Sequence, residues 1–299
     1  MKINPQSAIR NRVFRHGILN GKKGTAMKKL PKWIVTGLLI LFLVAAARTQ
    51  ADEKVVRLYL DADRSGAKQS GLSIEQGIRV ALSEIGNKLN GYKVELVIKD
   101  HRGNSRRSKK HLDQFLNDPR ALLVYGGLHS PPLLAYRDFI NQNRIPVLVP
   151  WAAAGPITRY PSAENWIFRL SIDDSKAGYV IARHAVQQHG YKKPHLLLEN
   201  TGWGKSNQKT ISRALAKMGI GNPPVSWFNW GLSEAGARDL LLTIARSGAD
   251  VIFLVGNASE GEVIARVMSG LPAAQRLPIY SHWGITGGDF PETINAGMR

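Results

Sequence analysis

Residues 121–150 read ALLVYGGLHSPPLLAYRDFINQNRIPVLVP, and this stretch decides the fold class. Ala121–Tyr125 is a continuous apolar run that ends at two glycines, which predicts a buried strand followed by a turn. Pro131–Asn143 reads as a helix, and Pro146–Val149 is a second short apolar run that stops at a proline. A strand, a helix and a strand in this order predict two parallel strands joined by a helical crossover.

The same alternation continues in both directions along the chain. Val55–Leu60 and Tyr92–Lys99 have strand patterns, and Ser73–Ile85 places its apolar residues on one side of a helix. After an apolar run at Trp166–Leu170, a second series follows the same rhythm. The remaining predicted helices are Lys109–Leu116, Ala177–His189, Ser206–Met218, Ala235–Ser247 and Glu260–Gly270, and the remaining predicted strands are His195–Leu198, Val225–Asn229, Val251–Val255 and Pro278–Ser281.

Two successive series of this kind predict an α/β chain with two lobes, each a doubly wound parallel sheet covered by helices on both faces. In such sheets, ligands bind beyond the carboxyl ends of the strands. We therefore expect a binding cleft between the lobes, formed by the loops 61–71, 100–108, 126–131, 150–158, 199–206, 256–261 and 281–288.

The N-terminal segment has the pattern of an export signal. Three lysines follow Met27 and precede the apolar run Trp33–Ala47, which is short for a membrane span. Thr49 and Ala51 are the small residues that a signal peptidase requires before a cut at Asp52. We expect an export leader at residues 1–51, with the signal peptide at 27–51 and the translation start at Met27, so that residues 1–26 are not part of the protein.

Composition narrows the possible partners. The chain has a formal net charge of +19 and no cysteine. Residues 1–51 contain ten Lys and Arg and no Asp or Glu, so the charge is +9 without them. Much of the basic charge that would suggest nucleic-acid binding therefore belongs to the leader, and we expect no nucleic-acid partner. The lack of cysteine excludes disulfides and a cysteine-linked lipid anchor.

Several short motifs occur in a fixed order along residues 54–290. They are Ser65-Gly66 with Gly77, Asn90–Val97 running to Asp100, Tyr125-Gly126-Gly127 with Ser130, Ile145-Pro146-Val147 running to Pro150, Phe168–Ser171, and the Glu199–Gly204 turn. In this order they resemble the periplasmic solute-binding proteins of the branched-chain amino-acid type, which have the type I periplasmic-binding fold. The resemblance implies an exported receptor that captures a solute between two lobes and presents it to the permease of an ABC importer.

The resemblance also implies that part of the fold is missing. Family members continue beyond the strand that matches Pro278–Ser281, whereas this chain stops at Arg299. We expect a first ligand-binding lobe at residues 52–170 and an incomplete second lobe at residues 171–299. Apolar surface of the first lobe would then be left uncovered.

The resemblance places the ligand's carboxylate against the first lobe. It implies binding by Ser130, after the Gly-Gly turn, and by the loop Trp151-Ala152-Ala153. Ala153 stands where amino-acid binders have a threonine hydroxyl, so only backbone N–H groups could donate hydrogen bonds to the ligand at this position. The alternative for Ser130 is that its hydroxyl only caps the helix that begins at Pro131.

From the second lobe, the resemblance implies that Trp203 contacts the ligand. It also places Trp283 where the family has an acidic residue that pairs with an α-ammonium group. Without that carboxylate, a buried ammonium would lack a partner, so we expect a carboxylate head and an apolar or aromatic body rather than a free α-amino acid. The alternative for each tryptophan is ordinary packing between lobes.

The sequence contains no complete phosphate-binding, catalytic or metal-binding motif. Gly204-Lys205-Ser206 ends like a phosphate-binding loop, but Glu199 stands where that loop requires its first glycine. Ser130 lies in no GxSxG elbow, and no acidic or histidine spacing matches a metal site. We therefore expect no enzyme activity, no metal and no cofactor.

Two hypotheses for function remain open. The first is a monomeric periplasmic receptor that serves an ABC importer, with a small molecule as its ligand. The second is an extracytoplasmic sensory domain that keeps Trp33–Ala47 as a membrane anchor facing the periplasm. N-terminal sequencing of the exported protein separates them, because a start at Asp52 rejects the anchor.

Overall fold

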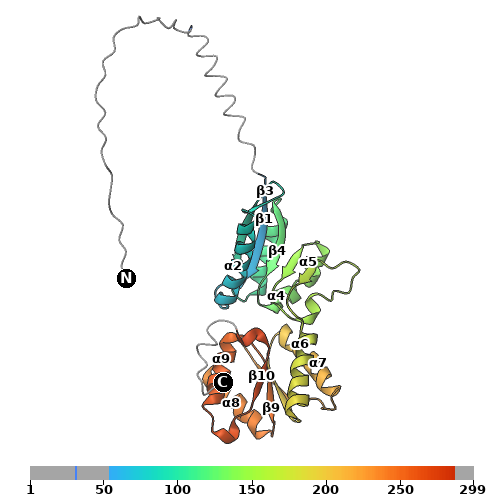
Figure 1. The fold of residues 1–299 in the computed structure, drawn as a ribbon, viewed down its shortest axis with the longest axis vertical. Coiled ribbons are helices and arrows are strands. Elements are labelled where there is room, and N and C mark those ends of the chain that lie inside the picture. Colours follow the sequence, from blue (N-terminus) through green and yellow to red (C-terminus); the bar gives the residue numbers. More distant parts are fainter. Residues whose placement is uncertain (1–30, 32–53, 287–299) are drawn as a thin grey trace, which may run out of the picture. The chain divides into compact units, whose positions relative to one another are not determined.

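The computed structural model describes Pro31 and residues 54–286, except for the side chain of Trp283. Every helix and strand described lies in the unit Glu53–Arg299 (Figure 1). None of the helices in this part of the chain is long and apolar enough to cross a membrane. The predicted leader, with its apolar run Trp33–Ala47, lies outside the described residues.

Strands from the first half of the described chain form one sheet, in the order β2-β3-β1-β4-β5-β6. They are β1 (Val55–Ala62), β2 (Lys88–Leu89), β3 (Tyr92–Asp100), β4 (Ala121–Gly126), β5 (Val147–Val149) and β6 (Ile167–Arg169). Neighbouring strands are parallel except β2 and β3, which form a short antiparallel pair. The parallel crossover predicted from residues 121–150 is thus confirmed by the pairing of β4 with β5.

The second sheet has the order β10-β9-β7-β8. Its strands are β7 (Pro194–Glu199), β8 (Val225–Phe228), β9 (Val251–Val255) and β10 (Ile279–Ser281), and all its pairs are parallel. Two parallel sheets with helical crossovers confirm the predicted α/β fold class.

Helices cover both faces of the sheets. They are α2 (Lys68–Glu84), α3 (Ser105–Leu116), α4 (Ser130–Ala135), α5 (Arg137–Gln142), α6 (Asp174–Arg183), α7 (Gly202–Ala216), α8 (Glu234–Arg246) and α9 (Ala258–Ser269), with short turns η1 (Gly155–Ile157), η2 (His184–Gln188), η3 (Ala273–Gln275) and η4 (Trp283–Thr286). In Figure 1, α8 and α9 lie on one side of the second sheet, and α6 and α7 lie on the other.

Strand β9 shows why both faces need cover. Ile252 and Leu254 belong to the apolar cluster that contains residues of α8 and α9, whereas Phe253 belongs to the cluster that contains residues of α7. Successive side chains of a strand point to opposite faces of the sheet. Because helices cover both faces, every residue of β9 is buried. Such continuous apolar strands are typical of parallel sheets between two helical layers.

The structure corrects several predicted helix boundaries. The predicted helix Pro131–Asn143 is two short helices, α4 and α5, which meet at Tyr136, where the backbone leaves helical geometry at φ −117° and ψ 19°. Helix α3 begins before Lys109 because the Asn104 side chain accepts hydrogen bonds from two backbone N–H groups of the first turn. Helix α6 begins at Asp174, capped by Asp173, and continues as a π turn rather than a regular helix to His189.

One apolar cluster links the two sheets. It runs from Tyr59 and Val149 of the first sheet, through Ala152 and Trp203, to Phe253 of the second sheet. The loop that follows β5 therefore lies against the core on one side and against the second sheet's elements on the other. This loop is where the candidate site begins.

Candidate ligand-binding site

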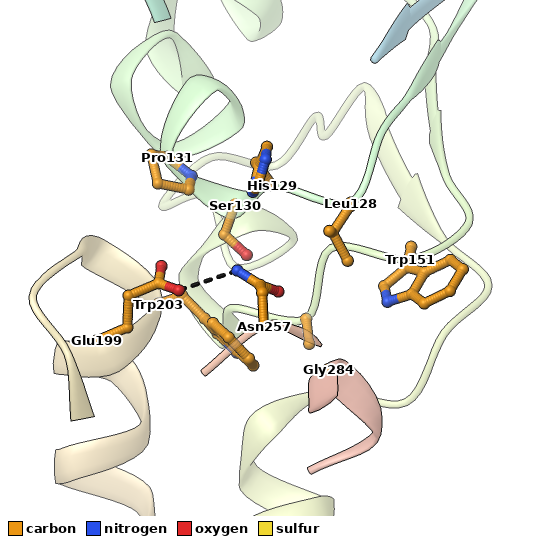
Figure 2. Close-up of a pocket in the computed structure, with 10 residues that line it drawn as sticks. Leu128, His129, Ser130, Pro131, Trp151, Glu199, Trp203, Asn257 and Gly284 are labelled. Carbon is orange, nitrogen blue, oxygen red and sulfur yellow. Dashed lines mark hydrogen bonds between the residues drawn. The ribbon is translucent and has the colours of Figure 1, made fainter. Parts of the chain in front are cut away.

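A pocket lies where loops at the carboxyl ends of both sheets meet (Figure 2). We call it the central pocket, and its lining residues are Leu128, His129, Ser130, Pro131, Trp151, Ala153, Glu199, Trp203, Asn257 and Gly284. Its cavity volume of about 10 Å³ leaves room for about one water molecule. A larger ligand can enter only when the two walls separate.

Ser130 is the first helical residue of α4, and His129 rather than Ser130 occupies the N-cap position. The interpretation of Ser130 as a helix cap is therefore wrong. Instead, its Oγ accepts a hydrogen bond from the backbone N–H of Ala154 at 3.2 Å. This contact holds the loop after β5 against the start of α4, with Ser130 only 4% exposed.

The predicted loop Trp151-Ala152-Ala153 is divided between the pocket and the core. Trp151 and Ala153 line the central pocket, whereas Ala152 lies in the apolar cluster. Ser171 donates a hydrogen bond to the carbonyl oxygen of Trp151 at 3.0 Å and fixes the loop from behind. The indole nitrogen of Trp151 is buried and has no hydrogen-bond partner among the described residues.

Trp203 forms the wall of the central pocket on the second-sheet side. It follows Thr201, whose side chain caps α7 by accepting from the Gly204 N–H. Its indole Nε1 donates to Asp174 Oδ1 at 3.0 Å. A side chain at Gly284 would place its Cβ 3.0 Å from the indole of Trp203, so glycine permits the turn after β10 to approach Trp203 closely on the second-sheet side. Trp283 is the first residue of η4, but its side chain lies outside the described part, so its role stays a prediction.

Three polar residues that line the central pocket, His129, Glu199 and Asn257, were not predicted as ligand contacts. Glu199, at the end of β7, accepts hydrogen bonds from Asn257 Nδ2 at 2.9 Å and from Thr201 Oγ1 at 3.0 Å. Burial raises the pKa of Glu199, against a hydrogen bond from Trp230 that favours the carboxylate. The signal that could have found Glu199 is its position at the carboxyl end of a fully apolar strand.

Two carboxylates on the second-sheet side lie beside the cleft, although the family's acidic position is Trp283. Glu199 and Glu260 are both nearly fully buried there. Glu260 accepts hydrogen bonds from Gly231 N–H at 3.0 Å and from Ser259 Oγ at 2.7 Å. Both carboxylates are thus held in place near the pocket, and an ammonium group has candidate partners there.

Two larger pockets adjoin the central pocket. One, of about 220 Å³, is shared between the start of α2 and the start of α9, and includes Leu128, Trp151 and Asn257. The other, of about 150 Å³, is lined by residues that include Asp63, His129 and Trp230. The shared lining residues make the three pockets parts of one cleft, which extends well beyond the central pocket.

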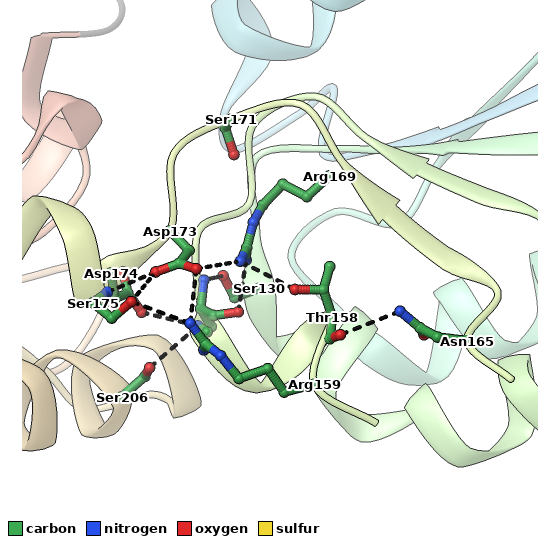
Figure 3. Close-up of polar contacts among 12 residues, drawn as sticks. Ser130, Thr158, Arg159, Asn165, Arg169, Ser171, Asp173, Asp174, Ser175 and Ser206 are labelled. Atoms are coloured by element: carbon green, nitrogen blue, oxygen red, sulfur yellow. Dashed lines mark hydrogen bonds and ion pairs between the residues drawn. The ribbon is translucent and has the colours of Figure 1, made fainter. Parts of the chain in front are cut away.

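Polar side chains tie the crossover between the sheets to the pocket walls (Figure 3). The backbone N–H of Gly155 donates to Asp174 Oδ2 and to Ser206 Oγ, both at 3.3 Å. Because Asp174 also accepts from Trp203, one buried carboxylate connects the loop after β5 with the aromatic wall. Beside it, Arg169 donates to the carbonyl of Ala154 at 2.9 Å.

The buried carboxyl group of Asp174 should make the stability of the protein depend on pH. Burial raises the pKa of Asp174 from 3.8 to about 6, although hydrogen bonds oppose the shift. A raised pKa in the folded state means that stability is full below the unfolded pKa and falls as pH rises toward 6. This group should lower the free energy of unfolding by about 2 kcal/mol between pH 4 and pH 6.5. Urea unfolding of Asp174→Asn and of the unchanged chain across this range measures the difference between their free energies of unfolding. A difference that does not change with pH would contradict the prediction.

In the part of the chain that the structure describes, no group of three or more His, Asp or Glu side chains is arranged to hold a metal ion. The site is thus built from hydroxyl, carboxylate, amide and aromatic groups. A cleft of this composition between two doubly wound sheets defines a two-lobed small-molecule binding protein.

Comparison with known sequences gives the family. The sequence profile of the family described as "Periplasmic binding protein" matches residues 59–272. The chain therefore belongs to the periplasmic binding protein family, a family of solute-binding proteins. The resemblance stated from short motifs is confirmed.

A curated relative is the Leu/Ile/Val-binding protein homolog 6 of Brucella abortus (strain 2308), which is 26% identical over 249 residues. The match covers 81% of this chain and 62% of the relative. The chain thus spans less than two thirds of that relative's length.

Solved structures share the fold. A type 1 periplasmic binding protein from Bordetella pertussis Tohama I matches with a TM-score of 0.70 and 18% identity, over 80% of this chain and 65% of that one. A solute-binding protein of an ABC transporter from R. palustris, in complex with 4-hydroxybenzoate, matches with a TM-score of 0.71 and 22% identity, over 80% of this chain and 65% of that one. The predicted type I periplasmic-binding fold is confirmed.

Proposed function

We propose that this chain is the ligand-binding part of an exported solute receptor, which works in the periplasm and delivers its ligand to the permease of an ABC importer. The observation that supports the proposal most directly is the central pocket, since its walls come from the carboxyl ends of both sheets. Membership of the family supports solute binding and the periplasmic location. We propose lobe boundaries at residues 52–170 and 171–299, and that the receptor is a monomer and carries out no chemical step.

The proposed mechanism is closure of the two lobes around the ligand. The central pocket alone has room for about one water molecule, so we propose that the ligand occupies it together with the adjoining pocket of about 220 Å³, after the walls of the central pocket have separated. A ligand that contacts Ser130 on one wall and Trp203 on the other stabilises the closed arrangement, because each contact is complete only there. The closed form is then the one that the permease binds.

The ligand we propose is a small solute with a carboxylate head. Ser130 Oγ accepts from Ala154 N–H, so the hydroxyl hydrogen can be donated to a ligand oxygen. Trp203 and Trp151 offer aromatic surface to an apolar or aromatic body, and Trp283 remains a proposed contact. The named ligands of the relatives, 4-hydroxybenzoate and the branched-chain amino acids, all carry a carboxylate.

Glu199 and Glu260 favour a second ligand class, the amino acids. A buried carboxylate is stabilised when a cationic group pairs with it, and an α-ammonium would supply this charge. Titration calorimetry with 4-hydroxybenzoate and with L-leucine, on the unchanged chain and on Glu260→Gln, separates the two classes. An amino-acid receptor should bind leucine at least tenfold more weakly after the substitution, whereas a benzoate receptor should not lose affinity. Absence of binding to a wider set of benzoates and amino acids by the folded chain would contradict the proposed function.

Ser130→Ala should weaken the binding of carboxylate ligands by about tenfold, because the substitution removes one donor to the anionic head. Ser171→Ala is the matched control, since the Ser171 hydroxyl holds the same loop through the Trp151 carbonyl but does not line the central pocket. Calorimetry on both variants measures the effect. Equal losses in the two variants would show that Ser130 acts only on the loop.

A further inference from the structure

Trp230 joins the two walls of the cleft at a point outside the central pocket. It follows β8, in a loop at the carboxyl end of the second sheet, and its side chain is 40% exposed. Its indole lies over the ring of His129, which follows β4 of the first sheet, with ring centroids 4.9 Å apart and an interplanar angle of 39°. The two sheets are therefore in direct aromatic contact here.

The first sheet leaves room for this indole at Gly103. A Cβ built on Gly103 would lie 3.1 Å from Cζ3 of Trp230, which is tighter than ordinary van der Waals contact. Gly103 also has a φ of +66°, a region that favours glycine. The loop after β3 thus fits closely against the Trp230 ring because it has no side chain at this position.

The same indole is connected to the central pocket. Trp230 favours the ionised form of Glu199, which lines that pocket, and so opposes the rise in the Glu199 pKa that burial causes. On the other side, His129 Nε2 lies 3.1 Å from Asp63 Oδ2, and both of these side chains are buried. Trp230, which follows the second sheet, therefore contacts the His129–Asp63 pair of the first sheet and influences Glu199 of the pocket.

We propose that Trp230 is a closure latch, a positioning residue that stabilises the closed arrangement of the two lobes through its contacts with His129 and Gly103. The contact needs no ligand, so it adds to closure whatever solute is bound. Its effect on affinity rests on the proposed function, whereas its effect on the ligand-free conformation does not. Trp230 lines neither the central pocket nor the adjoining pocket of about 220 Å³, so it acts on a ligand held there through the equilibrium between open and closed forms.

The first test uses the ligand-free 299-residue chain in small-angle X-ray scattering. Trp230→Ala should raise the radius of gyration, because the open form becomes more populated, and Gly103→Ala should do the same from the opposite wall by displacing the indole. Phe168→Ala, at an exposed aromatic of β6 outside the cleft, is the control and should leave the radius unchanged. Near-UV circular dichroism confirms that each variant is folded. An unchanged radius in both cleft variants would overturn the latch.

The second test measures dissociation by stopped-flow, with 4-hydroxybenzoate and L-leucine as probes. Trp230→Ala should raise the dissociation rate about three- to tenfold, as expected for the loss of one aromatic contact in the closed form. Trp230→Phe retains an aromatic ring over His129, so it should keep the compact radius and a dissociation rate near that of the unchanged chain. Failure of both probes to bind the unchanged chain would count against the proposed function alone, because the scattering result decides the latch without a ligand.

Discussion

Arg169→Ala should lower the free energy of unfolding by about 3–5 kcal/mol, the range found when one partner of a buried charged group is removed. The guanidinium side chain is only 5% exposed and lies 3.4 Å from Asp173. It also donates to the Ala154 carbonyl at 2.9 Å and to Thr158 Oγ1 at 3.2 Å. Alanine would remove the buried, charged donor that connects Asp173 and Thr158 with the Ala154 carbonyl, at the base of the loop that forms one wall of the pocket.

Arg159→Ala is the matched control, since Arg159 pairs with the same Asp173 at 2.7 Å but is 52% exposed. Water and salt screen such a surface pair, so we expect a loss of less than about 1 kcal/mol. Guanidinium unfolding of both variants, followed by tryptophan fluorescence, measures the two values. Equal losses would show that the shared acceptor, rather than the burial of Arg169, determines the effect.

Trp203→Ala should lower the free energy of unfolding by about 3–5 kcal/mol and abolish high-affinity ligand binding. Trp203 is 7% exposed and belongs to the apolar cluster that links the two sheets, so alanine would leave a large cavity. The substitution also removes the donor to the buried carboxylate of Asp174. Chemical unfolding and calorimetry on the same preparation measure the two losses.

Trp203→Phe separates packing from hydrogen bonding. Phenylalanine keeps most of the aromatic wall but cannot donate to Asp174, so a loss of about 1.5–3 kcal/mol is expected from the hydrogen bond to a charged group. Ligand binding should then be reduced much less than in Trp203→Ala. If the phenylalanine variant lost binding completely, the position of Asp174 rather than the aromatic surface would control the site.

The order of helices and strands could be predicted because hydrophobic periodicity is a local property. The apolar run Val251–Val255 was predicted with its observed bounds. Helix starts were less accurate, since α3 and α6 begin where the side chains of Asn104 and Asp173 accept backbone N–H groups. Such caps depend on one side chain each, and periodicity does not show them.

The candidate site was predicted in outline and corrected in detail. Ser130, Trp151, Ala153 and Trp203 lie together at the central pocket, as the loops at the strand ends indicated. Their contact with a ligand remains a prediction. Glu199 was named as part of a family motif and as the residue that excludes a phosphate-binding loop, but not as a ligand contact, although it is buried and lines the central pocket.

By itself, the sequence determined the fold class, the family and the loops in which the site would lie. Only the tertiary structure decided which polar groups face one another, because Glu199 meets Asn257 from 58 positions away, and Asp174 meets Trp203 from 29 positions away. Such contacts depend on the register of strands and on the approach of two sheets, and local pattern carries no information about either. The same reason explains Trp230, whose contact with His129 is formed only when the carboxyl ends of both sheets meet.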